Sequence, residues 1–226
     1  MEYINMDWVL IIITMVISLG ASAYIKSQYN KTRKIENNKG LTGYDVARKI
    51  LDANGLQHVK ILETSGELTD HYNPTDKTVT LSSDIYRNTS IASVSVASHE
   101  CGHAIQDKNG YFFLKFRNSI VPLVNFASRV GYIAILIGLF TSWIKFLWVG
   151  IFLEFIILFF QLLTLPVEFN ASDRALSQIY KLGIVDKKER SKCKSMLTAA
   201  ALTYVAGVAS AVLQILRLLL MVNRRR

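Results

Sequence analysis

The pentapeptide His99-Glu100-Cys101-Gly102-His103 decides how the rest of this chain is interpreted. In a helix, four residues make just over one turn, so the two imidazoles project from one face and can hold one metal ion. Glu100 lies about 100° further around the axis, where its carboxylate can reach a water on that metal without replacing a ligand. A zinc ion held by the two histidines, with the glutamate as general base, is the chemistry that this pattern favours.

The other two residues between the histidines, Cys101 and Gly102, also carry information. Cys101 points to the opposite side of such a helix, which predicts packing rather than metal binding. Gly102 leaves the flank of the helix open to another backbone or a substrate. The alternative interpretation is a buried helix whose histidines are hydrogen-bonded core residues, because short motifs also occur by chance.

The composition indicates a membrane protein, since 51% of the 226 residues are hydrophobic and 19% are charged, in alternating blocks. Residues 7–25 are long enough to cross about 30 Å of hydrocarbon. They lack the preceding basic stretch and the cleavage site of a removed signal peptide. Residues 130–165 fit a hairpin of two helices that turns near Trp143, and residues 199–222 form a fourth apolar stretch. We expect about four membrane-associated helices.

Basic residues predict the orientation. The first apolar stretch is followed by Lys26, Lys31, Arg33 and Lys34, which places the next segment in the cytoplasm. The hairpin then returns the chain to the cytoplasm, where residues 181–194 carry a second basic cluster. The terminal residues 224–226, all arginine, conflict with a spanning last helix. Either that helix lies in the interface or re-enters, or the arginines are tolerated outside.

The net charge of +9 suits a surface of anionic lipid. We expect no nucleic-acid partner, because no basic face with interleaved aromatic residues occurs outside the segments next to the membrane. Cys101 and Cys193 form no C-x-x-C pair, which fits a reducing compartment.

Residues 40–118 form a polar segment with its own secondary structure. Thr42 and Asp45 resemble a capping box, and Asn88, Thr89 or Ser90 is expected to cap the motif helix, which should break at residues 109–110. Short β-like stretches lie between these helices. The strand at residues 77–82 is either an exposed edge that binds an extended peptide or a strand paired on both sides. His58 and His71 are expected in surface or turn positions.

A catalytic zinc usually has three protein ligands and one open position. Glu154 lies inside the apolar hairpin, whereas Glu168 follows Pro166, where the chain re-enters the cytoplasm and a new helix can begin. Glu168 is therefore the candidate for the third ligand, although a glutamate also simply favours a helix N-terminus. Ala171 permits close helix approach, and Ser172, one turn after Glu168, could hydrogen-bond a ligand.

The blocks SHECGHAIQ (residues 98–106) and LPVEFNAS (residues 165–172) resemble the YugP-like family of bacterial membrane zinc metallopeptidases, and the likeness extends over nearly the whole chain. The chain is more distantly similar to HtpX-like and CAAX-prenyl-type membrane proteases. The resemblance implies that His99, His103 and Glu168 bind zinc and that Glu100 is the base. The distant relatives carry an acid where this chain has Ser172, with Asp173 beside it.

Ser172 and Asp173 are thus candidates for orienting a ligand. Tyr204 is a candidate donor to the oxyanion, although a phenol at a membrane interface is the commoner explanation for such a residue.

The predicted organisation has five segments. They are a transmembrane anchor (1–26), a cytoplasmic zincin-like segment with the motif helix (27–118), a transmembrane hairpin (119–166), a cytoplasmic helix with Glu168 (167–198), and an apolar helix with a basic tail (199–226). The predicted fold is a mainly α integral membrane protein with a small α+β catalytic part. It would lie in the bacterial plasma membrane, with the site facing the cytoplasm.

The sequence thus predicts a zinc metalloendopeptidase with one Zn²⁺ per chain, acting on membrane or membrane-adjacent polypeptides. One alternative is a non-catalytic zinc-binding scaffold or assembly subunit. Another is a transporter that uses Glu154 and Arg217, against which the four apolar segments and the lack of an internal repeat argue.

Overall fold

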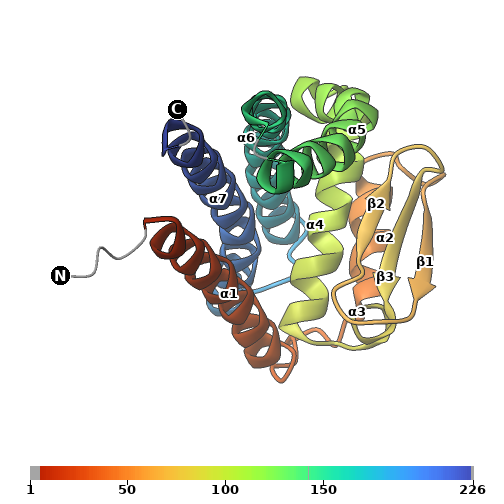
Figure 1. Cartoon of the computed structure of the whole chain (residues 1–226). Coiled ribbons are helices and arrows are strands. Elements are labelled where there is room, and N and C mark those ends of the chain that lie inside the picture. The colour runs from red at the N-terminus through yellow and green to blue at the C-terminus, as the bar shows by residue number, and fades with distance from the viewer. Residues whose placement is uncertain (1–5, 142, 225–226) are drawn as a thin grey trace. The chain divides into compact units, whose positions relative to one another are not determined.

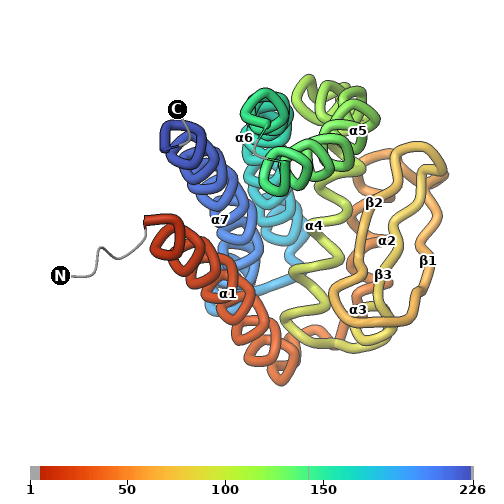
Figure 2. Tube along the Cα trace, in the orientation of Figure 1, coloured from red at the N-terminus to blue at the C-terminus, as the bar shows by residue number. Residues whose placement is uncertain are grey.

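Long helices dominate the chain, and a small sheet interrupts them (Figure 1). The computed structural model describes residues 6–141 and 143–224. In these residues the elements are α1 (Met6–Thr32), α2 (Gly43–Ala53), β1 (Lys60–Thr64), β2 (His71–Asn73), β3 (Thr78–Ser82), α3 (Ser83–Arg87), α4 (Ile91–Lys108), α5 (Phe112–Thr141), α6 (Ile144–Lys181) and α7 (Lys187–Arg224). Figure 2 follows the same path as a tube from α1 to α7.

Among the described residues, four helices, α1, α5, α6 and α7, are by length and composition long and apolar enough to cross a membrane. This confirms the prediction of a mainly α protein with about four membrane-associated helices and a small α+β part. The cytoplasmic location of that part stays a prediction.

The chain divides into two compact units. The apolar unit contains the described residues of Met1–Ala23, Phe116–Pro166 and Leu202–Arg226, and the mixed unit contains Tyr24–Lys115 and Val167–Ala201. Helices α1, α5, α6 and α7 each contribute to both units. The five-segment division drawn from the sequence stays a prediction.

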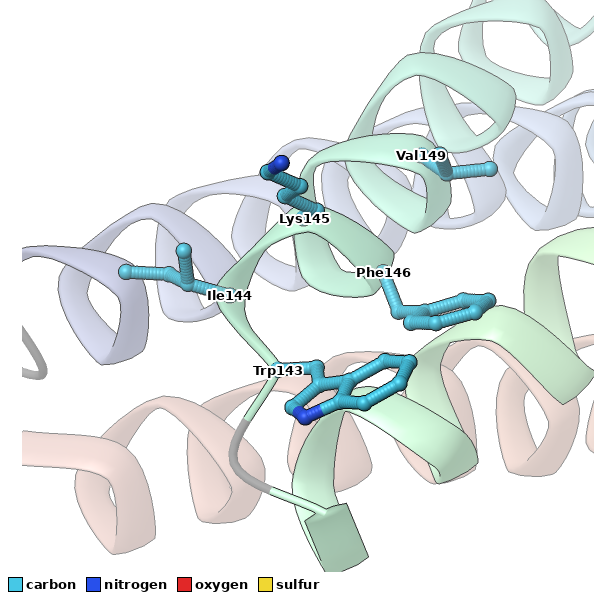
Figure 3. A pocket seen from close by; sticks show the side chains of 5 residues that line it. All are labelled: Trp143, Ile144, Lys145, Phe146 and Val149. Carbon is cyan, nitrogen blue, oxygen red and sulfur yellow. The ribbon is translucent and has the colours of Figure 1, made fainter.

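The apolar unit has its own core and a pocket at the start of α6. Ile135, Leu147 and Leu218 are buried together in that core. The pocket, of about 650 Å³, is lined by Trp143, Ile144, Lys145, Phe146 and Val149. Figure 3 shows the rings of Trp143 and Phe146 beside each other, stacked with an interplanar angle of 17°. Trp143 is 66% exposed, as an interfacial anchor would be.

An ion pair joins the two ends of the chain in the apolar unit. Arg224 Nη1 lies 2.6 Å from Asp7 Oδ2, so the end of α7 lies beside the start of α1. The alternatives drawn from the sequence for the last helix, spanning, interfacial or re-entrant, stay predictions. The last two arginines of the basic tail lie outside the described residues. In the same apolar unit, the positive charge of Arg217 interacts electrostatically with the carboxylate of Glu154.

Two helices continue where the sequence predicts a break. No new helix begins after Pro166, because α6 runs through it without interruption. Proline removes one backbone hydrogen bond, but its neighbours in a long helix can hold the geometry. Similarly, α7 starts at Lys187 and carries the polar cluster and the last apolar stretch as one helix.

Helix α2 of the mixed unit is stabilised by the residues at its own start. The Thr42 side chain accepts a hydrogen bond from the Asp45 backbone, and the Asp45 side chain accepts one from the Thr42 backbone. This confirms the predicted capping box. Val46, Ile50 and Leu51 of α2 are fully buried in the core that α2 shares with α4.

The three strands have the order β1-β3-β2. Strand β3 is parallel to β1 and antiparallel to β2, with Val79 opposite both Ile61 and Tyr72. All five residues of β3 are buried. The strand ahead of the motif helix is therefore paired on both sides, and the exposed-edge alternative for it is wrong. Tyr72 Oη donates to Asp107 Oδ2 at 2.7 Å, which ties β2 to the end of α4.

Helices α4 and α6 approach each other closely at one glycine. A Cβ on Gly102 would overlap the backbone carbonyl of Ala171. Both residues are small, so the two backbones can meet without a side chain between them. This confirms the close approach that the sequence predicted for Gly102 and Ala171.

We predict that Gly102→Ala forces α4 and α6 apart and destabilises the protein by about 1–3 kcal/mol, the usual cost of overpacking. Thermal unfolding in detergent would measure this. Gly20→Ala in α1 is the matched control, since a Cβ there meets nothing within 4 Å. Equal stability of the two variants would contradict the tight contact.

Candidate metal centre

The motif helix α4 is positioned by a cap at its start. Ser90 is its N-cap, and the Ser90 side chain accepts a hydrogen bond of 3.0 Å from the Ser93 backbone. The sequence offered Asn88, Thr89 or Ser90 as the cap, and the structure uses Ser90. The helix ends at Lys108 and its C-cap is Asn109, as predicted from the Asn109-Gly110 break. The motif therefore lies in the middle of a regular helix.

The two histidines of α4 meet one carboxylate of α6. His99 Nε2 lies 3.2 Å and His103 Nε2 lies 3.6 Å from Glu168 Oε2. The two imidazole rings stand nearly perpendicular, with centroids 4.8 Å apart. The side chains of His99, His103 and Glu168 each offer one ligand atom, and these atoms all lie within 4.8 Å of one another.

This donor set fits zinc. Two imidazole nitrogens and one carboxylate oxygen are common ligands of catalytic zinc, which retains a fourth position for water or substrate. Ligand atoms about 2.0–2.2 Å from a tetrahedral zinc lie roughly 3.3–3.6 Å from one another. The two histidine–Glu168 distances of 3.2 and 3.6 Å match that spacing.

Both histidines have a partner on the second ring nitrogen. Ser172 Oγ lies 3.3 Å from His99 Nδ1, and Gln106 Oε1 lies 3.0 Å from His103 Nδ1. The Nδ1 atoms are thereby held away from Glu168, and the Nε2 atoms face it. Ser172, one turn after Glu168, thus contacts a candidate ligand, and its role in orienting that ligand stays a prediction.

Glu100 lies beside the two histidines in a buried environment. Its exposed fraction is 7%. Burial raises the pKa of Glu100 to about 7, and the charges of Glu168 and Asp70 act in the same direction, while His99 and His71 oppose it. A carboxyl group with a pKa near neutrality can both accept and release a proton, as a general base requires.

Cys101 faces away from this cluster. Its side chain is fully buried in the core of the mixed unit, and its thiol contacts the backbone oxygen of Ala47 at 3.6 Å. The prediction of a packing role is confirmed. Cys193 is also buried, and both cysteines are free thiols.

Two other candidate residues, Asp173 and Tyr204, have surroundings of their own. Asp173 is exposed and lines a groove with four cations, namely Lys181, Lys187, Arg190 and Lys194. Tyr204 lies on α7 in the apolar unit and is 37% exposed. The roles suggested for these two residues stay predictions.

Some residues near the candidate site were not assigned a role from the sequence. Gln106 follows His103 by three residues on α4, a spacing that places both on one helix face. Asn170 reaches Gln106 from α6. Asp70 and His71, around the start of β2, act on Glu100 through their charge. Only the Gln106 spacing gave a signal in the sequence, because the others depend on contacts between distant segments.

Comparison with known proteins agrees with this geometry. Residues 7–223 match the family described as "putative neutral zinc metallopeptidase". The chain is also 44% identical over 201 residues to the "putative membrane protease YugP" of Bacillus subtilis (strain 168), covering 89% of each protein. Comparison with solved structures gives no significant match. The family match covers almost the whole chain, so this protein belongs to the zinc metallopeptidase family that the description names.

Proposed function

We propose that this protein is a membrane-bound zinc metallopeptidase that hydrolyses peptide bonds of membrane or membrane-adjacent proteins at the cytoplasmic face. The observation that carries the proposal is the convergence of His99 Nε2, His103 Nε2 and Glu168 Oε2 next to buried Glu100. Membership of the family supports peptidase chemistry and zinc as the metal.

In this proposal each polar residue has one task. His99, His103 and Glu168 hold one zinc, which when bound supplies a Lewis acid that activates water and polarises a carbonyl. Glu100 accepts a proton from the attacking water and transfers it to the leaving amine. The hydroxyl of Ser172 orients the His99 ring.

The substrate class follows from the connection between the site and an apolar helix. Glu168 lies three residues beyond the end of the apolar stretch that α6 carries, with no loop between them. Three helical residues span about 4.5 Å. A carboxylate tethered so closely to a membrane helix favours polypeptides in or beside the membrane over small soluble peptides.

We predict that Glu168→Ala lowers zinc affinity more than about 100-fold, since loss of a ligand should exceed the 10–100-fold cost of losing a residue that only supports one. Zinc per chain after dialysis against a chelator would measure this, with one ion expected in the wild type. The matched control is Glu67→Ala, because Glu67 is an exposed glutamate in an ion pair with Arg33. Full zinc retention by Glu168→Ala would remove Glu168 from the ligand set.

We predict that Glu100→Gln lowers the cleavage rate of an unfolded polypeptide by about 10²–10⁴-fold while zinc stays bound, because the amide cannot accept the proton. Cleavage in detergent and zinc content would be measured on the same preparation. Equal slow cleavage by both proteins would indicate a contaminating protease and contradict the role of Glu100. If both retain zinc but neither cleaves, the scaffold alternative is favoured.

We predict that the mixed unit faces the cytoplasm, because basic residues flank α1 and α7 on that side. A cysteine placed at exposed Glu67 should react with a membrane-impermeant maleimide only after the cells are permeabilised. A cysteine at Trp143, in the α5–α6 turn, should react in intact cells. The opposite labelling pattern would place the candidate site outside. The native thiols, Cys101 and Cys193, are buried and give a low background.

A further inference from the structure

Gln106 is a fully buried polar side chain that joins the two helices of the candidate site. Its exposed fraction is 0%. Its Oε1 atom lies 3.0 Å from His103 Nδ1. Its Nε2 atom donates to the backbone oxygen of Val167 at 2.8 Å and to Asn170 Oδ1 at 3.0 Å. The partners on α6 are thus one residue before and two residues after Glu168.

The chemistry of these partners fixes which way the Gln106 amide points. The carbonyl of Val167 can only accept a hydrogen bond, so the NH₂ group of Gln106 must face it. Asn170 is fixed in the same way, because Arg174 Nε can only donate and does so to Asn170 Oδ1 at 2.7 Å. Both acceptors therefore lie on the same side of Gln106, and its carbonyl oxygen is left for His103.

That orientation favours one tautomer of His103. The Gln106 carbonyl can only accept, so it favours the proton on His103 Nδ1 in the neutral ring, against the Glu168 carboxylate, which is also only an acceptor and lies beside Nε2. The lone pair is then on Nε2, the nitrogen 3.6 Å from Glu168 Oε2. The partner of His99 does not impose this choice, because the Ser172 hydroxyl can donate or accept.

We propose that Gln106 is a positioning residue that prepares the site for its metal by two actions of one side chain. It holds His103 as the Nδ1–H tautomer with Nε2 free to bind zinc, and it holds α6 on both sides of Glu168, through the Val167 backbone oxygen and the Asn170 side chain. The inference rests on the proposed zinc site and adds to it a residue that touches neither metal nor substrate.

Gln106→Met tests the proposal, because methionine has a similar length but lacks the amide that makes the three hydrogen bonds to His103, Val167 and Asn170. We expect zinc affinity to fall 10–100-fold, the usual cost of removing the partner of a ligating histidine. Affinity would be measured by competition with a chelating dye in detergent. Gln178→Met is the matched control. Gln178 also lies on α6, and its side-chain oxygen accepts a hydrogen bond from Asn54 Nδ2, away from the candidate ligands. We expect that control to bind zinc as the wild type does.

A second measurement separates positioning from a general packing role. ¹⁵N NMR of the histidine rings in metal-free protein, at a pH of about 9 where imidazole is neutral, reports which nitrogen carries the proton. We expect the Nδ1–H form of His103 in the wild type and a mixture of both forms in Gln106→Met. This measurement on the wild type holds even if the variant does not fold.

The outcomes distinguish this inference from the proposed function. A wild type that carries His103 as the Nε2–H tautomer, or a Gln106→Met variant that binds zinc within twofold of the wild type, would overturn the role of Gln106 alone. In either case the Glu100→Gln and Glu168→Ala results would stand. A wild type that binds no zinc would overturn both.

Discussion

The contact between Gly102 of α4 and the Ala171 carbonyl of α6 is the constraint on which the candidate site depends. The candidate ligands come from two helices, His99 and His103 from α4 and Glu168 from α6. Glu168 can approach His99 and His103 only if the two backbones lie unusually close. A glycine in the motif and an alanine one turn after the glutamate make that approach possible.

Polar contacts between the same two helices complete this packing. Gln106 donates to the backbone on one side of Glu168, and Ser172 contacts His99 one turn beyond it. Each buried polar group in this set has a partner, which is the condition under which such a network stabilises a unique arrangement. The network therefore specifies the geometry of the site, while the apolar core of α2, α4 and β3 supports the motif helix from its other side.

Much of this was predictable from short-range patterns. The capping box at Thr42, the end of α4 at Lys108 and the packing role of Cys101 all follow from residues within a few positions of each other. Glu168 could also be proposed from its place after an apolar stretch. The continuity of α6 through Pro166 could not be predicted from the sequence. A proline disfavours a helix locally, and only the packing of the whole long helix offsets that local cost.

The sequence by itself determined the lengths of the apolar helices and the face of α4 that carries both histidines, because periodicity and length are local properties. Only the tertiary structure decided that β3 is paired on both sides, that α7 ends beside the start of α1, and that Gln106 reaches α6. His99 and Glu168 are 69 residues apart in the chain. Contacts over such a separation depend on how whole helices pack, and no spacing within one segment encodes them.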